Sequence, residues 1–454
     1  MTDTPNRLSY ALIARKSLPI ILANASVPLL GLVDTALMGH VGSPSDLAAL
    51  AICTLIFNFI FWAFGFLRMG TTSLVARAEG ARSPHEESVS LKRQLAQSLV
   101  LAWLIAAGLL VLQFIIWWAA SGILGPPPEV SVSAGDYFFI RMWSAPATLT
   151  VYVINGVFIG LGFMRAVLAV QLVLNIGNAV FDYLFASHWS FGIQGIAIGT
   201  VLAEYLAASL AVFILATKHY WPSLQDFRFE NIRASFAQIL SQNSDIFIRT
   251  LLLLVAFAYF TRRGAAYGEL VLAANYLLLQ YISFSAFFLD GYAQVLEMFC
   301  GRAVGAKDAN AFVTALRRAS VLALTTALVL AGLFLLFFDS TVALLTDMPE
   351  VQLHAAEFRY WVFAYIILSV AAFQLDGVFI GAGFHRALRH SYIVAVGGFI
   401  VLAEAFVYLG RQQPAFASPD YLWCALLALI IFRGLTMSAF LPKLYREAFF
   451  SRID

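Results

Sequence analysis

Apolar segments of about 20 residues recur along almost the whole chain, and no other feature restricts its fold as strongly. Such segments cross a bilayer as helices, because a helix satisfies its backbone polar groups internally. Only 12% of the 454 residues are charged, against about 25% in an average soluble protein. We therefore expect an all-α, polytopic membrane protein with twelve transmembrane helices. The predicted spans are 17–39, 47–71, 94–119, 135–159, 166–186, 193–216, 240–261, 268–296, 316–338, 356–381, 388–409 and 420–442.

An internal repeat divides these spans into two sets of six. Residues 154–166 read INGVFIGLGFMRA and residues 375–387 read LDGVFIGAGFHRA, so the core GVFIGxGFxRA recurs at an offset of 221. A weaker pair, ARAEGAR at 76–82 and GRAVGAK at 301–307, recurs at an offset of 225. Because six is an even number, both halves insert with the same orientation, and a substrate path between them is expected.

The repeat also sets the predicted domain boundaries. We expect an N-terminal six-helix lobe with a coupling-ion site at 1–217, a cytoplasmic linker at 218–239 and a C-terminal six-helix lobe at 240–454. Two pseudo-symmetric lobes around a central cavity are typical of a transporter that works by alternating access. This architecture does not identify the cargo.

Lysine and arginine are distributed unequally between the two sides that the spans define. Most of them lie on the side of the two termini, and those assigned to the other side are Arg141, Arg262, Arg263, Arg359 and Arg411. The positive-inside rule therefore predicts that both termini are cytoplasmic. The N-terminal apolar segment lacks an A-x-A-like cleavage site before Asp34, so we expect it to be the first span rather than a cleaved signal.

A polar stripe interrupts the fifth span. Residues 175–185 read NIGNAVFDYLF, and Asn175, Asn178 and Asp182 fall within about 60° of one another on a helix. An ionised side chain at mid-bilayer costs about 2.5–3.5 kcal/mol on insertion scales. Such residues face protein or water, and they are candidates for function.

The depth of these side chains relates the stripe to two other spans. Asp34 and Asp182 each lie five residues before the outer end of their span, about 7–8 Å deep, and Thr200 lies roughly 12 Å deep in the sixth span. These three residues and Asn178 could form one oxygen-rich layer. The layer could hold a proton, because two close carboxylates do not both ionise cheaply, or it could ligate Na⁺. The alternative is a hydrogen-bonded network that only fastens helices together.

Other polar residues within the spans are weaker candidates for the cargo cavity or for support of the ion site. They are Asn175, Glu204, Asp290, Glu297 and Asp376. Glu204 lies one turn beyond Thr200 on the same helix face, and Asp376 opens the second copy of the repeat motif. Arg68 and Arg433 lie near inner helix ends, where a long side chain is expected to extend to the membrane surface.

Several functional classes are not expected. Basic residues do not cluster on one face, so nucleic acid is not an expected partner. Cys53, Cys300 and Cys424 lie far apart without metal-ligand spacing and are expected to be free apolar thiols, and no cofactor is expected. A membrane-embedded enzyme would need a large polar loop or a His/Asp motif at the interface. The loops are short and the His residues form no such motif, so we do not expect an enzyme.

Four stretches carry a resemblance to a known family: PLLGLVDTALMGHVGS (28–43), FLRMGTTSLVARAEGA (66–81), GVFIGLGFMRA (156–166) and NSDIFIRTLLL (243–253). They resemble the multidrug and toxic compound extrusion (MATE) family, in the branch of DNA-damage-inducible protein F (DinF). The resemblance implies twelve helices in two lobes, a monomer in the bacterial inner membrane, and export of organic, often cationic compounds in exchange for H⁺ or Na⁺.

The resemblance also implies roles for individual residues. The coupling cluster of that branch corresponds to Asp34, Asn178, Asp182 and Thr200, and Tyr137 and Asn155 match polar positions of the fourth span. Another branch uses a Glu of the seventh span with an Asp of the tenth. Here the seventh span contains Arg249 and no Glu, although Asp376 is present in the tenth.

We therefore expect a secondary antiporter that exports organic, cationic or amphipathic cargo in exchange for H⁺. Its partners would be the small organic cargo, H⁺ or Na⁺, and the lipid bilayer. Two alternatives stay open: Na⁺-coupled export of the same cargo, and a lipid-linked oligosaccharide flippase of the same superfamily. A flippase would need a cavity rich in Arg and Lys for phosphates, and few cationic residues lie within the spans.

Overall fold

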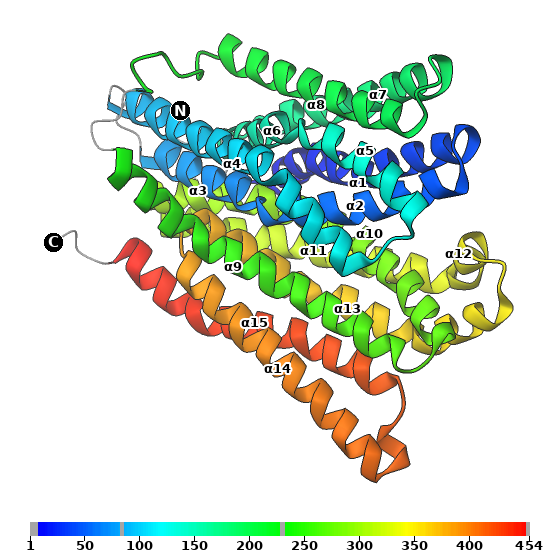
Figure 1. Cartoon of the computed structure of the whole chain (residues 1–454). Coiled ribbons are helices and arrows are strands. Elements are labelled where there is room, and N and C mark those ends of the chain that lie inside the picture. Colours follow the sequence, from blue (N-terminus) through cyan, green and yellow to red (C-terminus); the bar gives the residue numbers. More distant parts are fainter. Residues whose placement is uncertain (1–7, 82–85, 228–231, 451–454) are drawn as a thin grey trace. The chain divides into compact units, whose positions relative to one another are not determined.

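A computed structural model of the chain describes residues 8–81, 86–227 and 232–450, and over these ranges the chain is helical, without a β-strand (Figure 1). The helices are α1 (Tyr10–Val41), α2 (Pro44–Ala63), α3 (Phe66–Ala81), α4 (Glu86–Leu124), α5 (Pro128–Met142), α6 (Ala145–Gly160), α7 (Met164–Asp182), the π-helix η2 (Tyr183–His188), α8 (Gly192–Thr217), α9 (Ile232–Ala265), α10 (Glu269–Gly305), α11 (Ala309–Leu336), α12 (Phe338–Leu345), α13 (Pro349–Ala382), α14 (His385–Gln412), the 3₁₀ turn η3 (Pro414–Phe416) and α15 (Asp420–Phe449).

The number of long apolar helices agrees with the sequence. The described residues contain 11 helical segments that are long and apolar enough to cross a membrane, and up to 12 if α5 and α6, which meet at an angle of 50°, are taken as one bent span. The prediction of an all-α, polytopic membrane protein with twelve spans is confirmed. The chain is a multi-pass membrane protein.

The chain divides into two compact units. One comprises Leu22–Asn243, and the other combines the described residues up to Ile21 with those from Ser244 onward. Helix α1 therefore contributes its first part to one unit and the remainder to the other. Residues 228–231 of the predicted linker 218–239, and both ends of the chain, lie outside the described residues, and the linker stays a prediction.

The repeated motif has the same backbone structure in both units. Gly162 and Gly383, which are 221 positions apart, follow helices α6 and α13 with φ values of +75° and +78°. Only glycine adopts this left-handed conformation without a steric cost. Both copies of the motif therefore end a helix with the same turn.

The preceding glycines of the motif also pack in the same way. A Cβ on Gly156 would lie 2.5 Å from the carbonyl oxygen of Arg68, and one on Gly377 would lie 2.4 Å from that of Ala293. Arg68 and Ala293 are 225 positions apart, the offset of the weaker repeat. Both repeats thus mark one helix–helix contact, α3 against α6 in one unit and α10 against α13 in the other.

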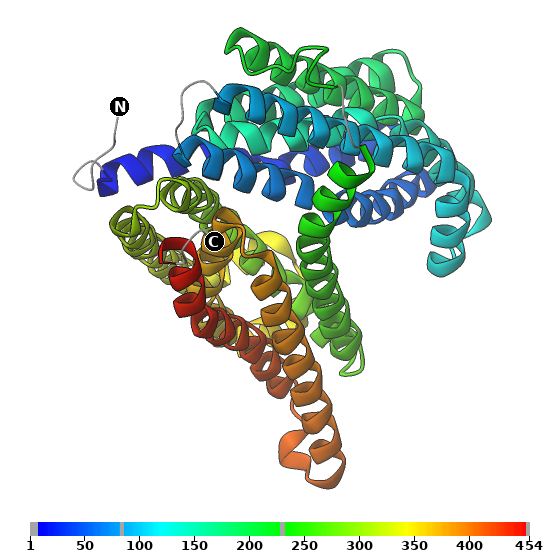
Figure 2. The ribbon, with the colours of Figure 1, turned by 90° about the vertical axis from the view of Figure 1, so that its left-hand side faces the viewer.

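Neighbouring helices in each unit lie side by side. Figure 1 shows α7 beside α8 within Leu22–Asn243, and Figures 1 and 2 both show α14 beside α15 in the other unit. The bend between α5 and α6 has a local cause in Pro146, which lies in the first turn of α6. Its ring has no N–H to donate and clashes with the carbonyl of the residue four positions earlier, so the helix cannot continue.

Candidate ion-coupling site

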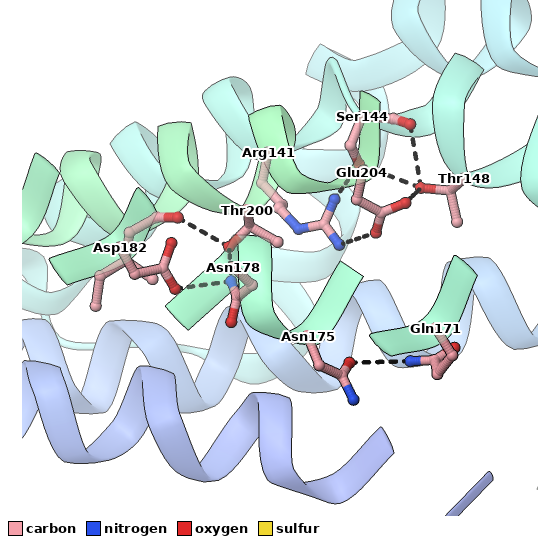
Figure 3. A network of polar contacts seen from close by, with 10 residues as sticks. Arg141, Ser144, Thr148, Gln171, Asn175, Asn178, Asp182, Thr200 and Glu204 are labelled. Carbon is pink, nitrogen blue, oxygen red and sulfur yellow. Dashed lines mark hydrogen bonds and ion pairs between the residues drawn. The ribbon is translucent and has the colours of Figure 1, made fainter. Parts of the chain in front are cut away.

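The four residues of the predicted cluster meet inside one unit. Asp34 comes from α1, Asn178 and Asp182 from α7, and Thr200 from α8, and each side chain is at least 94% buried. The Asn178 amide nitrogen donates to Asp182 Oδ2 over 2.7 Å and to Thr200 Oγ1 over 3.1 Å, and the Thr200 hydroxyl donates to the backbone carbonyl of Ile196 over 2.8 Å (Figure 3).

The two carboxyl groups of this cluster interact directly. The Asp34 and Asp182 side chains lie within hydrogen-bonding reach of each other, and Asn178 is within reach of both. One oxygen of each of these three side chains is buried without a hydrogen-bond partner among the described residues. Buried polar atoms are nearly always paired, and three such oxygens from neighbouring side chains can together accept a proton or ligate a small cation. The residues suit Na⁺ by their oxygen chemistry and a proton by the carboxyl pair.

Close packing of α7 and η2 against α8 puts Asp182 in this position. A Cβ on Gly199 would lie 2.1 Å from Asp182 Oδ1, and one on Gly195 would lie 2.6 Å from the backbone nitrogen of Ala186. Helix α7 gives way to the π-helix η2 directly after Asp182. Single π-turns within α-helices are frequent at functional sites, and the wider turn changes the direction in which the following side chains point.

Arg141 was assigned to an outer segment by the sequence analysis, and this was wrong. Its side chain is buried in the last turn of α5, where it donates to Glu204 Oε1 of α8 over 2.8 Å and to the Ser144 hydroxyl. The guanidinium also lies over the rings of Phe57 and Phe61, at 5.5 and 5.6 Å from their centroids. The signal was present in the sequence, because residue 141 falls inside the predicted span 135–159.

Glu204 has a second donor besides Arg141. The Thr148 hydroxyl of α6 donates to Glu204 Oε2 over 2.5 Å, so both carboxylate oxygens are hydrogen bonded. Figure 3 shows the Arg141 guanidinium between Thr200 and Glu204, with the Asn178–Asp182 contact beyond Thr200. That Glu204 supports the ion site stays a prediction, and its contact with Arg141 is consistent with it.

Three other predicted residues of this unit lie at different distances from the cluster. Tyr137 is buried one turn before Arg141, close enough for Asp34 and Asp182 to act on it electrostatically. The Asn175 amide donates to the carbonyl of Ser26 over 3.0 Å and so joins α7 to α1. Asn155 has a buried amide oxygen without a partner, and no described contact links it to the cluster.

A second polar cluster lies in the other unit. Asp376 Oδ2 of α13 accepts hydrogen bonds from Arg433 of α15 over 2.9 Å, from the Tyr392 hydroxyl of α14 over 2.6 Å and from Arg249 of α9. Both guanidinium groups lie over the Tyr392 ring, at 4.9 Å for Arg249 and 4.5 Å for Arg433.

This cluster changes the interpretation of Arg433 and Asp376. Arg433 was expected to extend to the membrane surface, but it is 98% buried and ion-paired, so that expectation was wrong. Asp290 lies within electrostatic reach of Arg249, and Glu297 is buried. Among the described residues no group of three or more His, Cys, Asp or Glu side chains is placed to hold a metal ion.

Comparison with known proteins gives the family. The family model MatE matches residues 19–184 and 246–406, which is most of the chain. The chain belongs to the MatE family. The resemblance to MATE transporters, in the DinF branch, is confirmed.

Individual relatives match this MatE protein along nearly its full length. It is 34% identical over 435 residues to the DNA damage-inducible protein F of Escherichia coli (strain K12), covering 95% of this chain and 92% of the relative. It is 25% identical over 447 residues to a probable multidrug resistance protein NorM of Acinetobacter baylyi, covering 94% of each. The crystal structure of the Vibrio cholerae MATE transporter VcmN in the bent form shares the fold, with a TM-score of 0.83 at 20% identity over 97% of this chain and 98% of that one.

Proposed function

We propose that this MatE protein is a secondary antiporter that exports organic, cationic or amphipathic compounds in exchange for H⁺ by alternating access. The observation that carries the proposal is the buried pair of Asp34 and Asp182, with one unpartnered oxygen on each carboxyl group. Two carboxyl groups in contact inside a protein titrate as a pair, and their charge state depends on a proton that the two share. Such a pair can couple a proton to a change of structure.

Exchange follows from competition for this pair. A cationic cargo prefers the ionised pair, and a proton removes that preference, so each ligand favours the conformation in which it binds better. One charge that crosses the membrane supplies about 2.3 kcal/mol per 100 mV, so the membrane potential drives export only when more charge enters as H⁺ than leaves with the cargo, and equal exchange is driven by the pH difference alone. Helix α1 contains Pro19 and Pro28, and each removes one backbone hydrogen bond, so α1 is the helix most able to bend when Asp34 changes charge.

Na⁺-coupled export is the second candidate. The unpartnered oxygens of Asp34, Asn178 and Asp182 are the kind of ligand that Na⁺ takes. We favour H⁺ because a proton needs only the carboxyl pair, whereas a metal ion needs a cage of several oxygens. The seventh span also lacks a Glu, its Asp245 is ion-paired with Arg389, and the Asp376 carboxylate already binds two guanidinium groups.

A flippase for phosphate-bearing lipids finds less support. The buried guanidinium groups that would bind a phosphate are already engaged by carboxylates, Arg141 by Glu204 and both Arg249 and Arg433 by Asp376. The multidrug resistance names of NorM relatives agree with the export of small organic compounds. We further propose that both termini are cytoplasmic, in the bacterial inner membrane, and that the transporter works as a monomer.

Efflux from proteoliposomes tests the proposal. A fluorescent organic cation is loaded, and either a proton gradient or an Na⁺ gradient at fixed pH is imposed. We expect efflux with the proton gradient and little with the Na⁺ gradient. Asp34→Asn and Asp182→Asn should each reduce proton-driven efflux at least tenfold, because one carboxyl group alone no longer forms the pair.

The matched control is Asp136→Asn, an exposed carboxyl group of α5 that accepts a hydrogen bond from Gln194. It should transport as the wild type does. Strong efflux driven by Na⁺ alone would reverse the choice of ion. Full proton-driven efflux by a well-expressed Asp34→Asn variant would remove Asp34 from the coupling site.

A further inference from the structure

Arg141 lies next to a bend of its span that the duplicated half lacks. The residues of α5 and α6 correspond, at the offset of 221, to the single helix α13, which continues without a break from Pro349 to Ala382. The position that corresponds to Arg141 is Val362, and the bend between α5 and α6 has no counterpart there. The Arg141 guanidinium and the bend beside it therefore have no counterpart at the corresponding positions of the other unit.

Two neighbouring side chains of α8 contact both the Arg141 guanidinium and the bend between α5 and α6. Arg141 donates to Ser144 at the bend and to Glu204, and the neighbouring Tyr205 hydroxyl donates to the carbonyl of Trp143 over 3.1 Å. Glu204 and Thr200 lie one turn apart on α8, about 6 Å along its axis. The guanidinium is thus held between the Glu204 carboxylate on one side and the layer of Thr200, Asn178 and Asp182 on the other (Figure 3).

The charged groups around the guanidinium are unbalanced. Three carboxyl groups lie in this network, Asp34 from α1, Asp182 from α7 and Glu204 from α8, and the Arg141 guanidinium acts electrostatically on all three. The other titratable groups that face this network are Tyr137 of α5, Cys53 of α2, Tyr152 of α6 and, beside Tyr152, Arg68 of α3. Deprotonation of the carboxyl pair therefore places its charge in the field of a cation that is covalently part of the protein.

We propose that Arg141 is a tethered cation shared between Glu204 and the Asp34–Asp182 pair, and that it sets the proton affinity of the pair and excludes Na⁺ from it. This inference rests on the proposed function, because it concerns how the same site selects its ion. Arg141 acts as a positioning residue that does not touch the cargo. With the pair protonated, Glu204 holds the guanidinium. With the pair ionised, the guanidinium offsets part of its charge and so weakens the binding of Na⁺ inside the buried cluster, whereas an organic cation that stays outside the cluster is still attracted by the net negative charge of the three carboxyl groups.

Opposite shifts in two variants test this proposal. Arg141→Gln removes a positive charge beside the pair, so protonation becomes easier and its midpoint moves to higher pH by about one unit. Glu204→Gln leaves the guanidinium without its counter-charge, so the midpoint moves to lower pH by about one unit. The double variant Arg141→Gln/Glu204→Gln restores the balance, and its midpoint should lie near that of the wild type.

The midpoint is read in two ways. The infrared C=O stretch of the protonated carboxyl group, assigned with Asp34→Asn and Asp182→Asn, is titrated in the purified protein. Proton-driven efflux is measured against external pH in proteoliposomes. In addition, Na⁺ should shift the infrared titration of Arg141→Gln and leave that of the wild type unchanged. Arg165→Gln is the control, since it removes an exposed arginine at the start of α7 in the same unit.

The outcomes separate this inference from the proposed function. Shifts of the same sign in both variants, or no shift in either, would overturn the tethered-cation proposal even if the wild type transports with H⁺. Opposite shifts of the two midpoints, without any proton-driven efflux by the wild type, would support the electrostatic role of Arg141 and contradict the proposed antiport function. Where a single variant does not fold, Arg141→Lys keeps the charge and should keep the pH profile. A folded Arg141→Lys protein without that profile would show that the role is geometric and would also overturn the proposal.

Discussion

At the scale of single residues, the carboxylate of Asp376 shows how a buried charge can be held by ion pairs through one oxygen, Oδ2, while Oδ1 has no partner among the described residues. It accepts from two guanidinium groups and from the Tyr392 hydroxyl, all within the unit that contains α9 to α15. Taking such charges out of water is costly, and the cost is recovered only while each has its partner. The sequence assigned Asp376 to the cargo cavity, and that role stays a prediction beside this structural one.

Asp376→Asn should lower the stability of the protein by about 3–5 kcal/mol, because it leaves two buried guanidinium groups without a full counter-charge. Arg433→Met should cost less, since Arg249 and Tyr392 still bind the carboxylate. Thermal unfolding of the purified proteins measures both, with Asp339→Asn, an exposed carboxyl group of α12, as a neutral control.

The pH dependence of exchange distinguishes the two units. In whatever fraction of Asp376→Asn folds, the dependence of efflux on external pH should match that of the wild type, while the range of transported compounds changes. If this variant loses its pH dependence while Asp34→Asn and Asp182→Asn keep theirs, ion coupling resides in the unit that contains Asp376, contrary to our assignment.

At the scale of elements, glycine decides where helices approach closely. Along α8, Gly195 and Gly199 lie one turn apart and face the end of α7 and the π-helix, and the next position in this row is Ala203. Small residues at this spacing let two helix backbones meet. Here they also make room for the Asp182 carboxyl group, so the packing surface and the ion site share one set of residues.

Gly199→Ala should therefore impair coupling as well as stability. Its methyl group would lie 2.1 Å from Asp182 Oδ1 and 2.7 Å from the backbone nitrogen of Asp182, so α7 must shift. Overpacking of this kind typically costs about 1–3 kcal/mol. Thermal unfolding and proton-driven efflux should both fall.

Gly108→Ala on α4 is the matched control, because nothing lies within 4 Å of a Cβ at that position. Replacing a helical glycine by alanine in open space should stabilise the protein by about 0.5–1 kcal/mol. Equal behaviour of the two variants would mean that the contact between Gly199 and Asp182 does not constrain α7.

At the scale of the whole molecule, both halves share the same helix packing, but only one of them carries the polar stripe. Both units retain the left-handed glycine after the repeat motif and the close helix contact before it. The positions that correspond to Asn178 and Asp182 at the offset of 221 are Phe399 and Ala403, and both are buried. One unit thus repeats the helix packing of the other, but it has buried apolar side chains at the positions of the polar stripe.

The orientation of the chain is a prediction at this scale, and cysteine labelling checks it. In a variant with Ser at positions 53, 300 and 424, Leu224→Cys in the connection after α8 should react with a membrane-impermeant reagent only from the cytoplasmic side. Ala266→Cys, in the connection between α9 and α10, should react only from outside. Both positions are exposed. The reverse pattern would place the termini outside.

The sequence by itself determined the parts of this protein that depend on local chemistry. Apolar length gave the spans, because a bilayer admits only segments that satisfy their own backbone. Helical periodicity and depth placed Asp34, Asn178, Asp182 and Thr200 in one layer, and the structure brings these four together. The duplicated motif also indicated that the chain consists of two homologous halves, and the structure showed which helix contact the repeats form.

Only the tertiary structure decided where the arginines go. The sequence placed residue 141 inside a predicted span and residue 433 near a helix end, but a single sequence does not show what faces a charge. Their carboxylate partners are distant in sequence, Glu204 at 63 positions and Asp376 at 57. Pairing across that distance depends on which helix faces are turned toward each other. The free energy of a buried charge is set by that partner, so the role of each arginine became visible only in the folded chain.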